Sequence, residues 1–383
     1  MAVVMPIYGT RPEAIKMAPI VQALGKERDI SCFVTVTGQH REMLDQVNSL
    51  FGIDPDVDLN ILRPGQSLSG ILSRTVDGLD ELFGRIQPDV VLVQGDTTSA
   101  AAGALTAFYH KIPVVHVEAG LRSGNLLSPF PEEANRKLIS QIAQLHLAPT
   151  HSSKRNLLEE GISDVDIAVT GNTVIDALLQ AVEMDLPVAD PRIEEAVQSG
   201  QTIVLATTHR RENQGGSMEA IGRALARIAE ADNDSIVILP AHRNPVVREA
   251  VLPWLANVPN VLVCEPLSYH EFARVMRASR IVVTDSGGVQ EEAPSLGKPV
   301  LVMRQNTERP EAVTAGTVKL IGTDEDRIVH EALKLLQVPS EYEAMANAVN
   351  PYGDGRAAER SISAILHLLG RGRRLPDFAP IIG

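Results

Sequence analysis

At 383 residues, with a formal net charge of −13 at pH 7 and only 3% aromatic residues, the chain is acidic and poor in aromatic rings. This balance argues against an extended nucleic-acid surface, which needs a basic stripe and usually stacking side chains. No apolar run reaches the roughly 18 residues that a membrane helix needs, and the N-terminus lacks the basic region and cleavage pattern of a signal peptide, so we expect a cytoplasmic protein without a membrane segment.

The first half of the chain alternates short β-branched runs with amphipathic stretches. The expected strands cover residues 2–7, 31–36, 90–95, 113–118, 145–149 and 166–171. The expected helices cover residues 13–27, 41–50, 67–86, 98–110, 131–142 and 151–160. This alternation is typical of βαβ units around a parallel sheet.

The alternation pauses at a proline-containing connector, residues 183–192, and then restarts. Further strands are expected at 202–208, 235–240, 260–265, 280–285 and 299–303, with helices at 217–231 and 245–255. The length also favours two domains. We therefore expect an α/β protein with two Rossmann-like doubly wound domains and a central cleft. The predicted domains are residues 1–170, joined by a C-terminal helix at 356–383, and residues 171–355.

Candidate contacts in the first domain follow its strands, where ligands of such sheets bind. Arg11 and Lys16 bring positive charge to a strand-to-helix turn, although surface cations on a capped helix would look the same. Asp96 and Glu118 end successive apolar runs; Asp96 can equally be a helix cap, whereas Glu118 is a poor cap. Glu132 begins a helix, where the helix dipole alone could explain it, and becomes a candidate because Asp96 and Glu118 are expected nearby.

In the second domain the run "HRREN" follows the first strand. His209 can supply a proton near neutral pH and Arg210 can hold a phosphate, whereas a solvated basic loop is the alternative. His242 follows the next strand in a similar position and is a weaker candidate. The histidines lack metal-ligand spacing and no GxGxxG fingerprint occurs, so we expect neither a metal nor a nicotinamide cofactor.

The stretch "TDSGGVQEEAPSLG" combines bare glycines with two adjacent glutamates. Ser286, Gly287 and Gly288 are expected to cradle phosphate at the start of a helix. Adjacent residues of a helix point about 100° apart, so the two carboxylates cannot share one role. We expect Glu292 to meet the ribose, and we interpret Glu291 as structural.

Two residues outside this turn complete the expected nucleotide site. Arg309, in "ERPEAV", adds positive charge for the phosphates. Phe272, in "SYHEFARV", offers an apolar or stacking surface for a base.

Seven motifs occur in order along the chain: "YGTRPEAIKMAP", "HVEAGLR", "PEEANR", "HRREN", "TDSGGVQEEAPSLGKPVL", "TERPEAV" and "NPYGDG". Together they resemble the bacterial non-hydrolysing UDP-N-acetylglucosamine 2-epimerases, from about residue 3 to residue 368. The resemblance implies a glycosyltransferase-B-like pair of domains, usually a homodimer. It also implies interconversion of UDP-GlcNAc and UDP-ManNAc, without a cofactor, to supply sugars for cell-surface polysaccharide.

The resemblance assigns roles to individual residues. The UDP-binding set corresponds to Arg11, Lys16, His209, Phe272, Ser286, Gly287, Gly288, Glu292 and Arg309. The acid/base set corresponds to Asp96, Glu118, Glu132 and His209. In many members a second UDP-GlcNAc binds as an activator, through counterparts of Gln39, Gln66, Glu132, Arg210 and His242.

Some positions depart from the family pattern. Glu42 and Gly65 replace a Gln and an Arg associated with the activator pocket. Leu267, Gln305 and Asn306 replace a Gln and an Asp–Thr pair, which affects the expected details of base binding. The phosphate-binding motifs are unchanged.

The implied chemistry agrees with these residues. C2 of the sugar has no adjacent carbonyl, so inversion requires either transient oxidation or elimination, and without a nicotinamide site elimination is left. A carboxylate would take the C2 proton while UDP leaves C1, giving a 2-acetamidoglucal to which UDP adds back. The sequence leaves open which carboxylate is the base.

Two other function classes stay open. A glycosyltransferase could use the same two-domain nucleotide-sugar fold, and a non-enzymatic UDP-sugar sensor could close on its ligand. The convergence of Asp96, Glu118, Glu132 and His209 argues against a sensor, which needs no acid/base groups. An acceptor site would usually add aromatic or variable loops.

Overall fold

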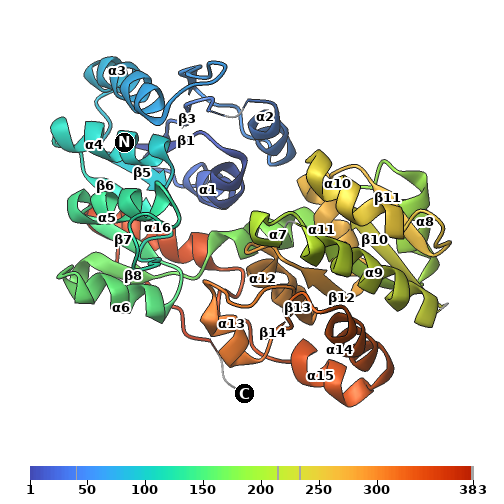
Figure 1. Cartoon of the computed structure of the whole chain (residues 1–383). Coiled ribbons are helices and arrows are strands. Elements are labelled where there is room, and N and C mark those ends of the chain that lie inside the picture. The colour runs from blue at the N-terminus through green and yellow to red at the C-terminus, as the bar shows by residue number, and fades with distance from the viewer. Residues whose placement is uncertain (40, 214, 233, 381–383) are drawn as a thin grey trace. The chain divides into compact units, whose positions relative to one another are not determined.

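The computed structural model describes residues 1–39, 41–213, 215–232 and 234–380, which form two compact units (Figure 1). Unit 1 comprises Met1–Ala177 and Tyr352–Ala379. Unit 2 comprises Leu178–Pro351 together with Pro380. Each unit contains a parallel sheet flanked by helices, and its helices and strands alternate along the chain. The α/β class and the Rossmann-like pair of sheets expected from the sequence are confirmed.

The sheet of unit 1 has the strand order β4-β3-β1-β5-β6-β7-β8, with β2 also pairing with β1. Every strand pair in its described part is parallel. The strands are β1 (Ala2–Tyr8), β2 (Ile30–Cys32), β3 (Thr35–Val36), β4 (Val57–Asp58), β5 (Val90–Gln94), β6 (Val114–Val117), β7 (Leu145–Ala148) and β8 (Ile167–Val169). The central strands β5 and β6 are buried along their whole length, as expected when helices cover both faces.

The helices of unit 1 connect its parallel strands. They are α1 (Arg11–Leu24), α2 (Arg41–Leu50), α3 (Leu68–Ile86), α4 (Thr98–Tyr109), α5 (Glu132–Ile142), α6 (His151–Glu159), α7 (Thr173–Glu183), which continues into unit 2, and α16 (Ala357–Leu368). The apolar faces of α3 and α4 meet β1 and β5 in a core that includes Ile7, Leu79, Phe83 and Val93. Helix α16, red in Figure 1, contacts α1, β7 and β8, so the end of the chain completes the first unit.

The sheet of unit 2 has the strand order β11-β10-β9-β12-β13-β14 and is parallel throughout its described part. The strands are β9 (Thr202–Thr207), β10 (Ser235–Pro240), β11 (Val261–Cys264), β12 (Ser279–Thr284), β13 (Val300–Val302) and β14 (Val318–Leu320). The helices are α8 (Pro191–Ser199), α9 (Gly216–Ala231), α10 (Pro245–Val251), α11 (Tyr269–Ala278), α12 (Val289–Glu292), α13 (Pro310–Ala315), α14 (Glu325–Gln337) and α15 (Pro339–Ala346).

Prolines account for two differences from the expected elements. The helix expected at 245–255 ends at Val251 and continues as a 3-10 turn that contains Pro253. The helix expected after the glycine pair is the four-residue α12, followed by a 3-10 turn through Pro294. Proline has no N–H to donate to the fourth residue before it, so the α-helical pattern cannot continue. The run at 31–36 also divides, into β2 and β3.

Several elements were not expected from the sequence. Helix α8 begins inside the predicted connector, and α11 joins the strands β11 and β12. The short strands β4 and β14 extend the two sheets. No helix in the described part of the chain is long and apolar enough to cross a membrane.

Candidate active site

The turn after β1 is organised by a buried glutamate. Glu13 accepts hydrogen bonds from the backbone amides of Gly9 at 3.0 Å and Thr10 at 2.8 Å, and from the hydroxyl of Thr97 at 2.6 Å. Burial raises the pKa of Glu13, and these donors oppose that rise. A side chain on Gly9 would place its Cβ 1.9 Å from Thr37 Oγ1. Glu13 therefore ties the turn that carries Arg11 to the loop that carries Asp96.

Glu118 follows β6 in a left-handed backbone conformation, with φ of 62°. This region is costly for a residue with a side chain and is often found at functional positions. Its Oε1 accepts from Lys16 Nζ and, at 3.0 Å, from Asn172 Nδ2, while its Oε2 accepts from Gln94 Nε2. Three separate segments thus fix the carboxylate. The structure places Lys16 on Glu118, a contact that the sequence did not indicate.

Asp96 follows β5 and lies opposite a cation of α5. Arg136 Nη2 is 2.6 Å from Asp96 Oδ2, and Arg136 Nη1 is 3.1 Å from Glu133 Oε2. Glu133 is fully buried and accepts from the amides of Ser123 and Gly124. Burial would raise its pKa, but these amides and Arg136 together hold it below the usual range. Glu133 is therefore structural.

Glu132, the first residue of α5, is half-buried beside this group. Arg11, the first residue of α1, is also half-buried. Asp96 and Glu118 follow the adjacent strands β5 and β6, so the carboxyl edge of the sheet brings these two carboxylates to neighbouring positions.

In unit 2 a single buried carboxylate organises the loop after β9. Asp285, which follows β12, accepts from the Thr208 hydroxyl, from the amides of His209 and Arg210, and from Asn213 Nδ2, at 2.9–3.1 Å. Strands β9 and β12 are neighbours, so the loop that follows one strand rests on the residue that ends the other. The sequence reasoning missed Asp285; a buried acid directly after a strand was the available signal.

His209 is held against the same aspartate. Its Nδ1 lies 3.3 Å from Asp285 Oδ1, and its ring stacks on His242, with 5.7 Å between the ring centroids. Burial lowers the pKa of His209, while the charge of Asp285 opposes this effect. A neutral imidazole keeps one ring nitrogen as a proton acceptor. This arrangement suits a group that exchanges protons near neutral pH.

The glycine turn gathers positive charge. A Cβ built on Gly287 would lie 2.7 Å from Arg309 Nη1 and 3.2 Å from Arg210 Nη2. Arg210 Nε also donates to the carbonyl of Asp285. Two guanidinium groups therefore lie against the bare backbone beside Ser286. This combination can hold a diphosphate, because arginine and backbone amides both bind phosphate oxygens.

The two adjacent glutamates have different partners. Glu291 Oε1 accepts from Arg309 Nε at 2.6 Å, and Glu292 Oε1 accepts from the Tyr269 hydroxyl at 3.1 Å. Both carboxylates are largely buried. Glu291 thus fixes Arg309, while Glu292 is directed toward α11.

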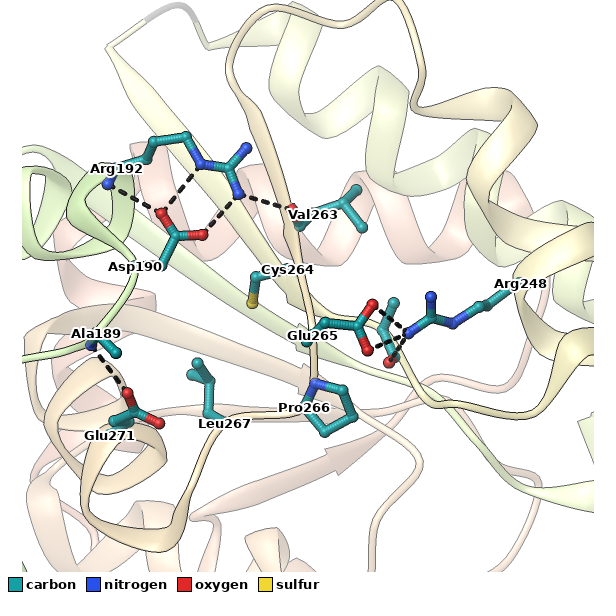
Figure 2. A pocket seen from close by; sticks show the side chains of 11 residues that line it. Ala189, Asp190, Arg192, Arg248, Val263, Cys264, Glu265, Pro266, Leu267 and Glu271 are labelled. Carbon is teal, nitrogen blue, oxygen red and sulfur yellow. Dashed lines mark hydrogen bonds and ion pairs between the residues drawn. The ribbon is translucent and has the colours of Figure 1, made fainter.

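A hollow of about 470 Å³ lies at the carboxyl ends of β10 and β11. Figure 2 shows Cys264 and Leu267 on its wall, with the Arg248–Glu265 ion pair at one side. Phe272, the residue predicted to meet the base, is half-buried and is not among the residues that line this hollow. Among the described residues no group of three histidine, cysteine or acidic side chains could hold a metal ion.

The residues assigned to a second nucleotide fall in both units. Gln39 accepts from the Ser99 hydroxyl at 2.8 Å, and Gln66 accepts from Arg74 Nη2 at 2.6 Å, both within unit 1. Arg210 and His242 belong to unit 2, where they lie next to Gly287 and His209 respectively. Arg210 thus adjoins the candidate phosphate turn.

The model of the family described as "UDP-N-acetylglucosamine 2-epimerase" matches residues 22–366. The chain belongs to this family. The UDP-N-acetylglucosamine 2-epimerase of Escherichia coli K12 is 52% identical over 367 residues, covering 94% of this chain and 98% of the relative. The enzyme of the same name from Bacillus subtilis 168 is also 52% identical, over 98% of this chain and 97% of the relative.

Structural similarity agrees with the family. The UDP-GlcNAc 2-epimerase of Neisseria meningitidis, solved with UDP-GlcNAc bound, is 47% identical and has a TM-score of 0.85, covering 95% of this chain and 100% of that one. The resemblance drawn from the seven motifs is therefore confirmed, and with it the glycosyltransferase-B-like fold of this epimerase family. The roles of the individual residues stay predictions.

Proposed function

We propose that the protein catalyses the reversible epimerisation of UDP-N-acetylglucosamine at C2 to give UDP-N-acetylmannosamine. One observation carries the chemistry: Glu118 is held in a left-handed turn by Lys16, Gln94 and Asn172, and it follows the strand next to β5, which Asp96 follows. A carboxylate fixed so firmly at the carboxyl edge of a sheet is suited to proton transfer at a defined carbon.

The proposed reaction begins with elimination. A carboxylate of the set Asp96, Glu118 and Glu132 removes the C2 proton, the C1–O bond breaks, and its electron pair leaves with UDP while a C1–C2 double bond forms. In the second stage an oxygen of UDP attacks C1 and C2 is reprotonated on the opposite face. His209 is proposed to exchange a proton with the UDP oxygen at C1.

The leaving diphosphate is proposed to bind at the glycine turn. Ser286, Gly287 and Gly288 supply backbone amides, and Arg309, fixed by Glu291, supplies charge. Arg11 and Lys16 are proposed to add positive charge, while Phe272 and Glu292 contact the base and the ribose. Stabilising charge as it develops is usually the largest catalytic contribution, so these groups would lower the barrier to elimination.

Incubation of the pure protein with UDP-GlcNAc alone in deuterated water tests this proposal. We expect UDP-ManNAc, with deuterium at C2 of the product, because the C2 proton exchanges with solvent during each turnover. Absence of product until an acceptor is added would instead indicate a glycosyltransferase. Binding of UDP-GlcNAc with neither turnover nor exchange would indicate a sensor.

Three further features are proposed on the strength of the family resemblance: a homodimer, a cytoplasmic location, and a product that serves cell-surface polysaccharide. Activation by a second UDP-GlcNAc, through Gln39, Gln66, Glu132, Arg210 and His242, is proposed in the same way. Hyperbolic kinetics, with no stimulation of the reverse reaction by UDP-GlcNAc, would contradict this activation.

A further inference from the structure

Asn172 lies between β8 and α7, and it is 3% exposed. Its Nδ2 donates to Glu118 Oε1 at 3.0 Å, and its Oδ1 accepts from the amide of Val174 at 3.1 Å. Its backbone amide donates to the carbonyl of Tyr352 at 2.7 Å. One buried side chain therefore connects the start of a helix to the carboxylate in the left-handed turn.

We propose that Asn172 is a positioning residue for the epimerisation, which orients the Glu118 carboxylate toward the sugar. This inference rests on the proposed role of Glu118. Asn172 itself is not expected to touch the substrate, since its side chain is buried.

The hydrogen bonds of Asn172 show which end of its side-chain amide faces Glu118. Because its carbonyl oxygen accepts from the amide of Val174, the NH₂ group must point to Glu118. The contact cannot reverse, since a carboxylate that is also paired with Lys16 only accepts hydrogen bonds. Lys16 is half-buried on α1 and has a long flexible side chain, whereas Asn172 is short and is held at both its backbone and its side chain. Asn172 is therefore a more rigid donor to Oε1 than Lys16.

The variant Asn172→Asp separates this role from a structural one. Aspartate keeps the acceptor that caps α7, but it replaces the donor to Glu118 with a second carboxylate. We expect kcat to fall roughly tenfold to a hundredfold, the range lost with one hydrogen bond to a charged group, while KM for UDP-GlcNAc stays within about twofold. The acid limb of the pH–kcat profile should move to higher pH, because two neighbouring carboxylates hold a proton more tightly than one.

The control is Asn347→Asp, the same substitution at an exposed position in unit 2. Asn347 follows α15, so this change adds a carboxylate without placing it in the turn of Glu118, which belongs to unit 1. We expect an unchanged pH profile and nearly unchanged kcat. If Asn172→Asp folds poorly, Asn172→Ser keeps a cap but is too short to reach Glu118, and it should show the same loss of kcat without the pH shift.

A double-mutant cycle with Glu118→Gln completes the test. If Asn172 acts through Glu118, Asn172→Asp should cost little further activity in the Glu118→Gln background. Two outcomes would overturn this inference while leaving the proposed function intact. The first is an equal loss from Asn172→Asp in both backgrounds. The second is an active Asn172→Asp variant with unchanged kcat and an unchanged pH profile. A wild-type protein that does not turn over UDP-GlcNAc would refute the proposed function and this inference with it.

Discussion

Glu291 and Arg309 form a partly buried ion pair, in which Arg309 Nε donates to Glu291 Oε1 at 2.6 Å. The arginine is thereby held with Nη1 against Gly287. Adjacent glutamates beside a phosphate-binding turn look unfavourable in the sequence. The structure gives the two carboxylates different partners: Glu291 pairs with Arg309, which we propose to bind phosphate, and Glu292 accepts from Tyr269.

Glu291→Gln should therefore weaken both stability and nucleotide binding. Removal of one hydrogen-bonded charge next to a mostly buried arginine should lower the free energy of unfolding by about 1–3 kcal/mol. KM for UDP-GlcNAc should rise, because Arg309 loses its fixed orientation. Urea denaturation and steady-state kinetics measure the two effects. The control Glu341→Gln breaks an exposed pair with Lys334 and should change neither by much.

Gly287→Ala tests the glycine turn without removing any charge. The added methyl group would meet the ends of Arg309 and Arg210 and displace their guanidinium groups from the turn. We expect KM to rise roughly tenfold, as for the loss of one charge-assisted contact, with a stability change below about 1 kcal/mol. Gly84→Ala, where no atom lies within 4 Å of the new Cβ, is the control and should leave KM unchanged. Equal KM values for the two variants would contradict a phosphate role for this turn.

Asp285→Asn should destabilise unit 2. Asparagine presents one NH₂ group where four groups now donate to the carboxylate, so at least one donor would face another donor. We expect a loss of about 2–4 kcal/mol and a lower kcat, because the His209 loop rests on this residue. The chain has one tryptophan, Trp254 in unit 2, so its fluorescence reports the unfolding of that unit. Asp326→Asn, at a highly exposed position, is the control.

Two buried histidines of unit 1 should make the fold sensitive to acid. Burial lowers the pKa of His116 to about 3 and that of His146 to about 4, so both are neutral in the folded state. In the unfolded chain they gain protons below about pH 6.5. Their contribution to the free energy of unfolding is therefore complete above pH 6.5 and is lost as the pH falls toward 4. By pH 5 the loss is roughly 2 kcal/mol for each histidine.

His116→Gln should accordingly flatten the decline in the free energy of unfolding between pH 7 and pH 5. Asp176 acts in the opposite sense, because burial raises its pKa to about 6, so the comparison must be between variant and parent. Circular dichroism during urea denaturation at both pH values measures the difference. His151→Gln, at an exposed position, should leave the decline unchanged. Parallel curves for His116→Gln and the parent protein would contradict the prediction.

The fold was largely predictable because buried parallel strands are apolar along their whole length and alternate with amphipathic helices. The predicted helix boundaries were wrong where a proline interrupts the helical hydrogen bonds. Helix α12, for example, is one turn long because Pro294 follows it closely. Short edge strands such as β14 carry too few apolar residues to stand out.

The sequence indicated which candidate residues follow strands, but not which groups these residues contact. Residues that end strands, such as Glu118, could be chosen because the carboxyl ends of parallel strands meet at one edge. The groups that hold them are distant in sequence: Asn172 is 54 residues from Glu118, and Thr97 is 84 residues from Glu13. Local patterns carry no information about such pairs. The contact between Glu291 and Arg309 likewise joins residues 18 positions apart.

The bonds to Asp285 also bear on the order of folding in unit 2. They join residues 72–77 positions apart, across the β9–β12 pair, while β10 and β11 lie between these strands in the sequence. The hydrogen bonds that hold the loop of His209 can therefore exist only when β12 lies beside β9. A nucleotide bound there would recognise only the completed sheet, and at a hundred times its dissociation constant it would stabilise that sheet by about 2.7 kcal/mol. Partly folded chains would gain nothing from the ligand.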